Sequence, residues 1–144
     1  MAVSAKAYGN FPKHLAAGLV AFTTDTIKCA LTTSTYTPDQ DNHDYFNDVT
    51  NEVTGTGYTA GGATLASKTS TYSGGSNTLA LDAADVTWAS STITARRAVV
   101  YKDTGTASTS PLIGYVDLGE DLSSTGGPFT ITWDAAGMLT CVVA

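Results

Sequence analysis

Alternation of apolar and polar residues with a period of two dominates this chain and predicts strands rather than helices. The clearest example is the segment 91–101, in which the odd-numbered residues, among them Ile93, Val99 and Tyr101, share one face. β-branched and aromatic residues of this kind fit the pleated surface of a sheet. The same pattern predicts further strands at residues 26–33, 63–68, 78–82, 86–89, 113–118, 129–133 and 138–143.

Turn-forming residues separate these segments at spacings near ten residues. They gather at residues 55–57, 61–62, 73–77 and 123–128, and residues 134–137 are typical of a short hairpin connection between the last two strands. Helical signals are limited to residues 15–22 and 43–52. This arrangement predicts an all-β fold, an antiparallel β-sandwich or barrel of the jelly-roll kind with at most one or two short helices. We expect residues 1–24 to form an N-terminal arm and residues 25–144 to form a single β domain.

The composition narrows the class of protein further. The 144 residues include 25 threonines and 12 serines, but only 14% are charged, and the net charge is −6. An acidic chain with one adjacent basic pair, Arg96–Arg97, is unsuited to binding nucleic acid, which needs clustered lysine and arginine. No apolar stretch approaches the length of a membrane span. The sequence therefore predicts a compact domain with neither nucleic acid nor a membrane as partner.

The N-terminal arm carries four large apolar residues, which we expect to contact a partner protein: Phe11, Leu15, Leu19 and Phe22. The two cysteines, Cys29 and Cys141, both lie in apolar strand segments. We expect them to be buried thiols, although a disulfide between them stays an alternative because sequence says nothing of their distance.

Catalytic and metal-binding patterns are weak. Asp39, Asp41 and Asp44 resemble the opening of a calcium loop, but the glycine and the closing glutamate of that loop are missing. A solvated loop with side-chain caps explains the same residues, so we expect no metal and no cofactor. Only His14 and His43 could serve as a histidine base, and neither accompanies an activated serine motif. We therefore do not expect an enzyme.

Two further groups of residues have a structural and a functional interpretation. Arg96 and Arg97 are neighbours on a strand and should point to opposite faces, one paired with a carboxylate such as Asp85 or Asp117 and the other facing solvent or an acidic partner. The tryptophans lie among threonines in strand segments, at Trp88 and Trp133. We expect them in the core, whereas exposed tryptophans would support a carbohydrate-binding module that contacts a host surface.

A series of short motifs resembles a group of small virion structural proteins of tailed bacteriophages. It begins with Ile27-Lys28-Cys29-Ala30-Leu31, Tyr36-Thr37-Pro38-Asp39, Asp48-Val49-Thr50-Asn51-Glu52-Val53 and Gly57-Tyr58-Thr59-Ala60-Gly61-Gly62. It continues with Leu81-Asp82-Ala83-Ala84-Asp85-Val86-Thr87-Trp88, Ser91-Thr92-Ile93-Thr94-Ala95-Arg96, Ala98-Val99-Val100-Tyr101-Lys102-Asp103-Thr104, Leu112-Ile113-Gly114 and Phe129-Thr130-Ile131-Thr132-Trp133-Asp134. The motifs are specific as a series, each being weak alone, and they cover roughly residues 26–143.

The resemblance implies a non-enzymatic component of the virion, assembled in the host cytoplasm. We expect a capsid decoration or cement protein that binds and stabilises the lattice of the major capsid protein, as a homo-oligomer and specifically a trimer. A tail-associated or head-fibre protein is the alternative within the same class, with tail proteins as its partners. Free thiols suit assembly in a reducing compartment.

Overall fold

Two β-sheets and one short helix make up the molecule, and the computed structural model describes residues 2–144. The larger sheet contains β1 (Ala2–Val3), β2 (Lys6–Ala7), β3 (Ile27–Thr32), β4 (Ala63–Thr64), β7 (Val86–Lys102) and β8 (Leu112–Trp133). The smaller sheet contains β5 (Thr69–Ser73), β6 (Thr78–Asp82) and β9 (Leu139–Val142). All pairings are antiparallel except that of β1 with β8. The predicted all-β, sandwich-like class is confirmed.

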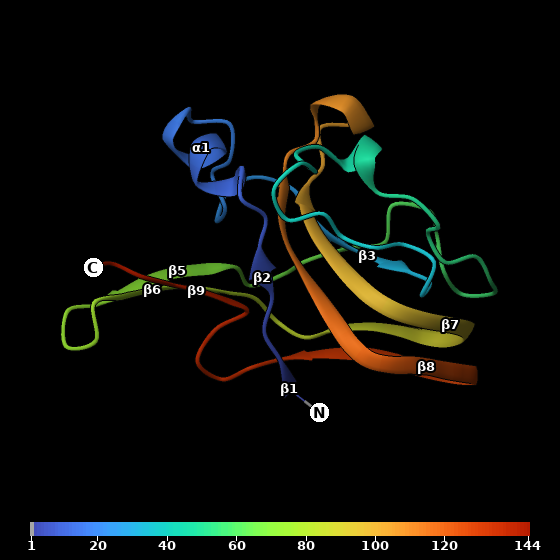
Figure 1. Cartoon of the computed structure of the whole chain (residues 1–144). Coiled ribbons are helices and arrows are strands. Elements are labelled where there is room, and N and C mark those ends of the chain that lie inside the picture. Colours follow the sequence, from blue (N-terminus) through green and yellow to red (C-terminus); the bar gives the residue numbers. More distant parts are fainter. Residues whose placement is uncertain (1) are drawn as a thin grey trace.

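The long strands β7 and β8 form the frame of the molecule and run side by side over most of their length (Figure 1). Each merges two strands that the sequence predicted separately, and the turn expected at residues 123–128 is wrong. Gly119 and Gly126 absorb the irregularities within β8 by adopting positive φ, so the strand continues where a turn was expected. Four register shifts along the β7–β8 ladder bend the pair.

The centre of the larger sheet is buried on both faces. On β3, Ile27, Cys29 and Leu31 enter the main core, as their alternation predicted, while Ala30 enters a second cluster on the opposite face. That second cluster is built from Tyr8, Tyr36, Val99, Tyr101 and Leu112 beneath the loops. The main core takes side chains from both ends of β7 and β8, so the bent pair encloses much of its own core.

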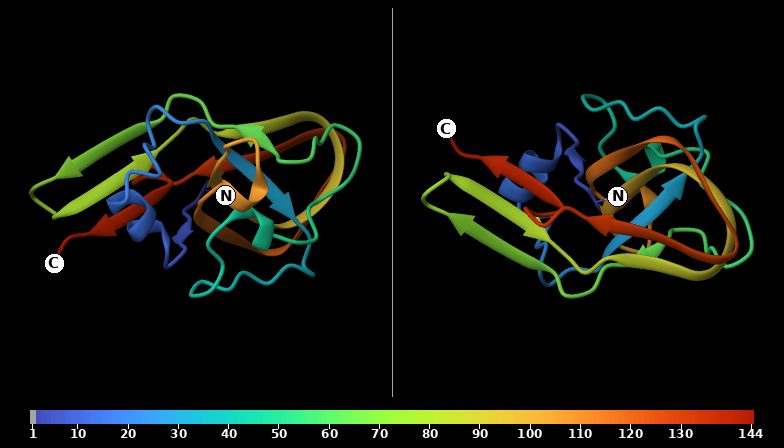
Figure 2. Two further views of the ribbon diagram at one scale, coloured as in Figure 1. Left: turned by 90° about the horizontal axis from the view of Figure 1, so that it is seen from above. Right: turned by 90° about the horizontal axis from the view of Figure 1, so that it is seen from below.

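The smaller sheet projects from this body, with the β5–β6 hairpin at its tip and the C-terminus beside it (Figure 2). β6 lies in its centre, between β5 and β9. The connection at residues 134–137 is therefore not a hairpin, because β9 pairs with β6 rather than with β8. Of the predicted strand 63–68 only β4 forms, and the strand β5 follows it.

Helix α1 spans Phe11–Ala16, not the predicted 15–22. Pro12 is suited to the first turn of a helix, and Gly18, at φ +72°, takes the left-handed conformation that ends one. Single 3-10 turns lie at Phe46–Asp48, within the predicted helical segment 43–52, and at Ala107–Thr109. Within residues 2–144, no helix is long and apolar enough to span a membrane.

Candidate functional site

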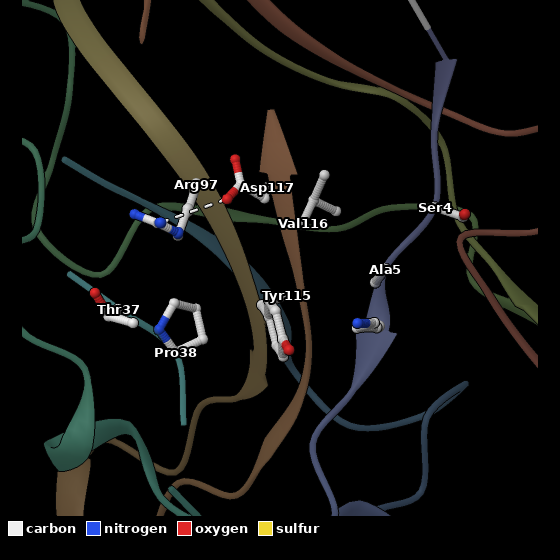
Figure 3. A pocket seen from close by; sticks show the side chains of 9 residues that line it. Ser4, Ala5, Thr37, Pro38, Arg97, Tyr115, Val116 and Asp117 are labelled. Carbon is white, nitrogen blue, oxygen red and sulfur yellow. Dashed lines mark ion pairs between the residues drawn. The ribbon is translucent and has the colours of Figure 1, made fainter. Parts of the chain in front are cut away.

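A broad hollow in the surface lies beside Arg97, between β2, β7, β8 and the loop after β3 (Figure 3). It measures about 520 Å³ and is lined by Ser4, Ala5, Lys6, Thr37, Pro38, Arg97, Tyr115, Val116 and Asp117. Arg97 donates from Nη1 to the carbonyl oxygens of Ser34, at 3.2 Å, and Tyr36, at 2.5 Å. Its Nη2 lies 3.4 Å from Oδ2 of Asp117. These contacts fasten the loop after β3 to β7, so the guanidinium is occupied within its own chain.

Arg96 and Arg97 converge on one carboxylate, although neighbours on a regular strand should point apart. Nε of Arg96 donates to Oδ1 of Asp117 over 2.8 Å, which confirms the pairing with Asp117. This hydrogen bond lowers the pKa of Asp117, and the same contact raises the pKa of Arg96. The prediction that the two arginine side chains point to opposite faces is wrong, because the β7–β8 ladder is irregular between Ala95 and Arg97. Asp85, the other predicted partner, instead accepts a hydrogen bond from the backbone N–H of Trp133.

A second site, an apolar groove, separates α1 from the projecting sheet. Its walls are formed by Ala7, Phe11, Pro12, Leu15, Leu79, Leu81, Leu139, Thr140 and Cys141, and its volume is about 170 Å³. Leu79 lies opposite Cys141 and Leu81 opposite Leu139, so these four side chains share the face of the sheet that turns toward α1. Among residues 2–144, no charged side chain lines the groove. Its chemistry suits an apolar side chain of another protein.

The four apolar residues of the predicted arm divide into two pairs. Phe11 and Phe22 are 4% and 5% exposed and belong to the main core, and Phe11 also lines the apolar groove. The partner-binding role expected for these two residues stays a prediction. Burying two phenylalanines in the chain's own core is the alternative that sequence cannot exclude. Leu15 and Leu19 remain exposed at 36% and 44%. Leu15 forms part of the apolar groove, whereas Leu19 borders a different hollow beside Lys102.

The acidic loop forms a network of caps. Asp39 accepts hydrogen bonds from the backbone N–H groups of Asp41 and Asn42 and from the Asn42 side chain. These bonds lower the pKa of Asp39, and the bond from the Asn42 side chain has the largest effect. The backbone N–H of Asp44 donates to Asp48. Within residues 2–144 no group of three or more histidine, cysteine or acidic side chains is arranged to hold a metal ion.

The two histidines have different surroundings. His43 lies 3.0 Å, through Nδ1, from the Tyr36 hydroxyl, which in turn lies 2.9 Å from the hydroxyl of Tyr8. His14 is 2% exposed, contacts the ring of Tyr45, and has no hydrogen-bond partner for either ring nitrogen among the described residues. Burial lowers the pKa of His14.

Both tryptophans lie in the core, as predicted, with Trp88 6% and Trp133 5% exposed. The carbohydrate-binding hypothesis thus loses its main support, because its stacking platform is covered. Cys29 is buried, and its burial raises the pKa of the thiol to about 12. Cys141 is exposed on β9, so the expectation of a second buried thiol is wrong; both cysteines are free.

Sequence reasoning missed the apolar groove. Its walls come from residues 7–15, 79–81 and 139–141, and no local pattern indicates that these segments meet. The available signal was the shared apolar face of residues 79 and 81 and of residues 139 and 141.

Comparison of the chain with models of protein families, with curated proteins and with solved structures gives no match.

Proposed function

We propose that this protein is a non-enzymatic structural component of a tailed-phage virion. In its most specific form, the proposal is a capsid decoration protein that binds and stabilises the lattice of the major capsid protein. The motif series of residues 26–143 supports the virion role. Binding only the assembled lattice would stabilise that lattice by mass action, without any chemical step.

The observation that carries a binding role is the apolar groove beside α1. It is uncharged in a chain of net charge −6, and Leu15 at its wall is 36% exposed. Apolar pockets that accept an anchoring side chain are typical of protein–protein interfaces. The body behind the groove is cross-connected by the paired frame strands and by ion pairs such as Lys28–Asp103 and Lys102–Asp25. A cross-connected body with an apolar groove on its surface suits repeated binding to a lattice.

The test is co-sedimentation of the purified protein with undecorated expanded capsids and, separately, with isolated tails. We expect saturable binding to capsids at near-lattice stoichiometry. Binding to tails alone would contradict decoration and favour the tail-associated alternative. If the protein binds neither particle, the virion role itself is wrong.

Point variants connect this binding to the groove. Deleting residues 1–22 would remove Phe11 and Phe22 from the core, so a single surface substitution is the cleaner change. We expect Leu15→Asp to weaken capsid binding by at least about tenfold, because a charge then lines an apolar site. Leu19→Asp is the matched control, since Leu19 is similarly exposed but lies outside the groove. If the two variants weaken capsid binding equally, the groove is not the capsid-binding site.

A further inference from the structure

The outer edge of β9 is open and lacks the usual protection of an edge strand. Within the part of the chain that the structure describes, β9 pairs with β6 on one side only, in a regular register from Leu139 to Val142. Natural edge strands are commonly guarded by lysine, proline or a bulge. Residues 135–144 contain no charged residue and no proline. This edge is therefore chemically ready to pair with another strand.

The backbone groups that point outward can be assigned from the hydrogen bonds on the inner side. The N–H of Val143 donates to the carbonyl of Asn77 on the β6 side. Alternate residues of an antiparallel strand turn both backbone groups to the same side. Cys141 lies two residues before Val143, so its backbone N–H and C=O groups also point toward β6. The backbone N–H and C=O groups of Thr140 and Val142 point away from β6. The next outward carbonyl, that of Met138, is already bound by the N–H of Ala5.

The side chains at this edge are also more apolar than those at the other free edge of the sheet. Val142 is 70% exposed and Val143 53% exposed, the two being consecutive in the chain. The opposite edge, β5, consists of threonine and serine apart from Tyr72. The edge strands of the larger sheet, β1, β2 and β4, are two residues long each. β9 is the edge that leaves both backbone groups and aliphatic side chains in water.

We infer that β9 pairs antiparallel with β9 of a second copy of this chain, about a two-fold axis at Cys141. In this register Thr140 lies opposite the partner's Val142, and Val142 opposite the partner's Thr140. In each of these pairs, the N–H of either residue donates to the C=O of the other. The outward backbone groups of Thr140 and Val142 are then all hydrogen-bonded. The apolar face of the sheet then continues across the axis, because Cys141 shares that face with Leu79.

The absence of charged side chains on β9 favours a second copy of this chain as the partner. Like charges placed opposite each other destabilise a strand pair, and a two-fold axis places identical strands opposite each other. A chain of net charge −6 repels its own copies wherever its charged surfaces meet, but β9 offers an uncharged contact. The pairing uses the backbone edge of β9, and Cys141 at the axis also lines the apolar groove on the face of the sheet. The inference does not rest on the proposed virion role, and a two-fold dimer differs from the trimer expected from the phage resemblance.

Oxidative cross-linking of the purified full chain tests the pairing and its register. At the axis the two Cys141 residues form a non-hydrogen-bonded pair, whose Cα atoms lie about 4.5 Å apart, within the range of a disulfide. We expect copper(II)–phenanthroline in air to convert the dimer to a covalent dimer, and Cys141→Ser to abolish this product. Cys29 is buried and should not contribute.

Two matched variants separate this edge from its neighbour. We expect Val142→Lys to raise the dimer dissociation constant by at least about tenfold in sedimentation equilibrium and to slow cross-linking in parallel. Tyr72→Lys on β5, at a site also more than half exposed, should leave both unchanged. A chain that stays monomeric up to its solubility limit would overturn the inference. So would a trimer, or a dimer that Tyr72→Lys breaks and Val142→Lys does not.

Discussion

The body around β3, β7 and β8 and the projecting sheet of β5, β6 and β9 are both antiparallel, yet different forces stabilise them. In the body, β3 has five fully buried residues among six, because side chains pack on both faces of the sheet. In the projecting sheet every residue of β5 is exposed, and only Leu81 on β6 and Leu139 on β9 are buried. Side-chain burial stabilises the body, whereas the backbone ladder and one apolar face stabilise the projection.

This difference indicates where the molecule can bind without losing its fold. A region that contributes little to the core can expose apolar side chains and open edges at small cost in stability. Three of the five large apolar side chains exposed within residues 2–144 belong to the projection or follow it directly: Tyr72, Val142 and Val143. Leu15, beside the same sheet, is a fourth. The body thus contains most of the buried core, whereas the projection carries most of the exposed large apolar side chains.

The largest effect should come from matched leucine truncations in the two regions. Leu31 is fully buried, whereas Leu79 is only partly buried. We expect Leu31→Ala to lower the free energy of unfolding by about 2–5 kcal/mol, because it leaves a cavity. Leu79→Ala should lower the free energy of unfolding by about 1 kcal/mol or less, because the partly buried Leu79 side chain removes less apolar surface from water on folding. Urea denaturation measures both, and equal losses would contradict the proposed division of roles.

A smaller effect should distinguish the two arginines at Asp117. Arg97 is 14% exposed and donates to the carbonyls of Ser34 and Tyr36. We expect Arg97→Ala to lower the free energy of unfolding by about 1–3 kcal/mol, because the carbonyls of Ser34 and Tyr36 lose a charged donor. Arg96→Ala should cost clearly less, since exposed ion pairs contribute little. Thermal unfolding of both variants checks this order, and a larger loss for Arg96→Ala would show that the ion pair, not the loop contact, matters.

The smallest effect concerns pH and arises at His14, a buried residue of α1. Burial lowers the pKa of His14 in the folded state, so the unfolded chain binds a proton more readily. The stability due to neutral His14 is fully present above the unfolded value of 6.5 and is lost as the pH falls below it. We expect the melting temperature to fall between pH 7.5 and about pH 5, and to fall less in His14→Leu. Asp25, Asp103 and Asp117, whose pKa values are lowered, add a loss only below about 3.8.

An identical pH profile for the wild type and His14→Leu would show that His14 is not the group involved. His43 is present in both proteins, so the difference between their profiles isolates His14.

Local patterns predicted strand positions best where a strand is short and regular. The predicted strand 78–82 matches β6 in full, and 26–33 differs from β3 by one residue at each end. The prediction failed where glycines interrupt a long strand, as at Gly119 and Gly126, because the same residues also make turns. For the candidate sites, the pairing of Arg96 with Asp117 was predictable, since charge chemistry limits the choice of partners.

The sequence by itself determined the positions of the regular strands, such as 78–82 and 26–33, and which side chains of such a strand share a face, because a period of two is a local property of the backbone. It also determined that residues 135–144 have no charged side chain. Only the tertiary structure decided that β9 pairs with β6 and that Phe11 and Phe22 enter the core. It likewise decided that α1 stands over the projecting sheet to form a groove. Such choices depend on the packing of segments far apart in the chain, where many weak contacts add up and no single local pattern dominates.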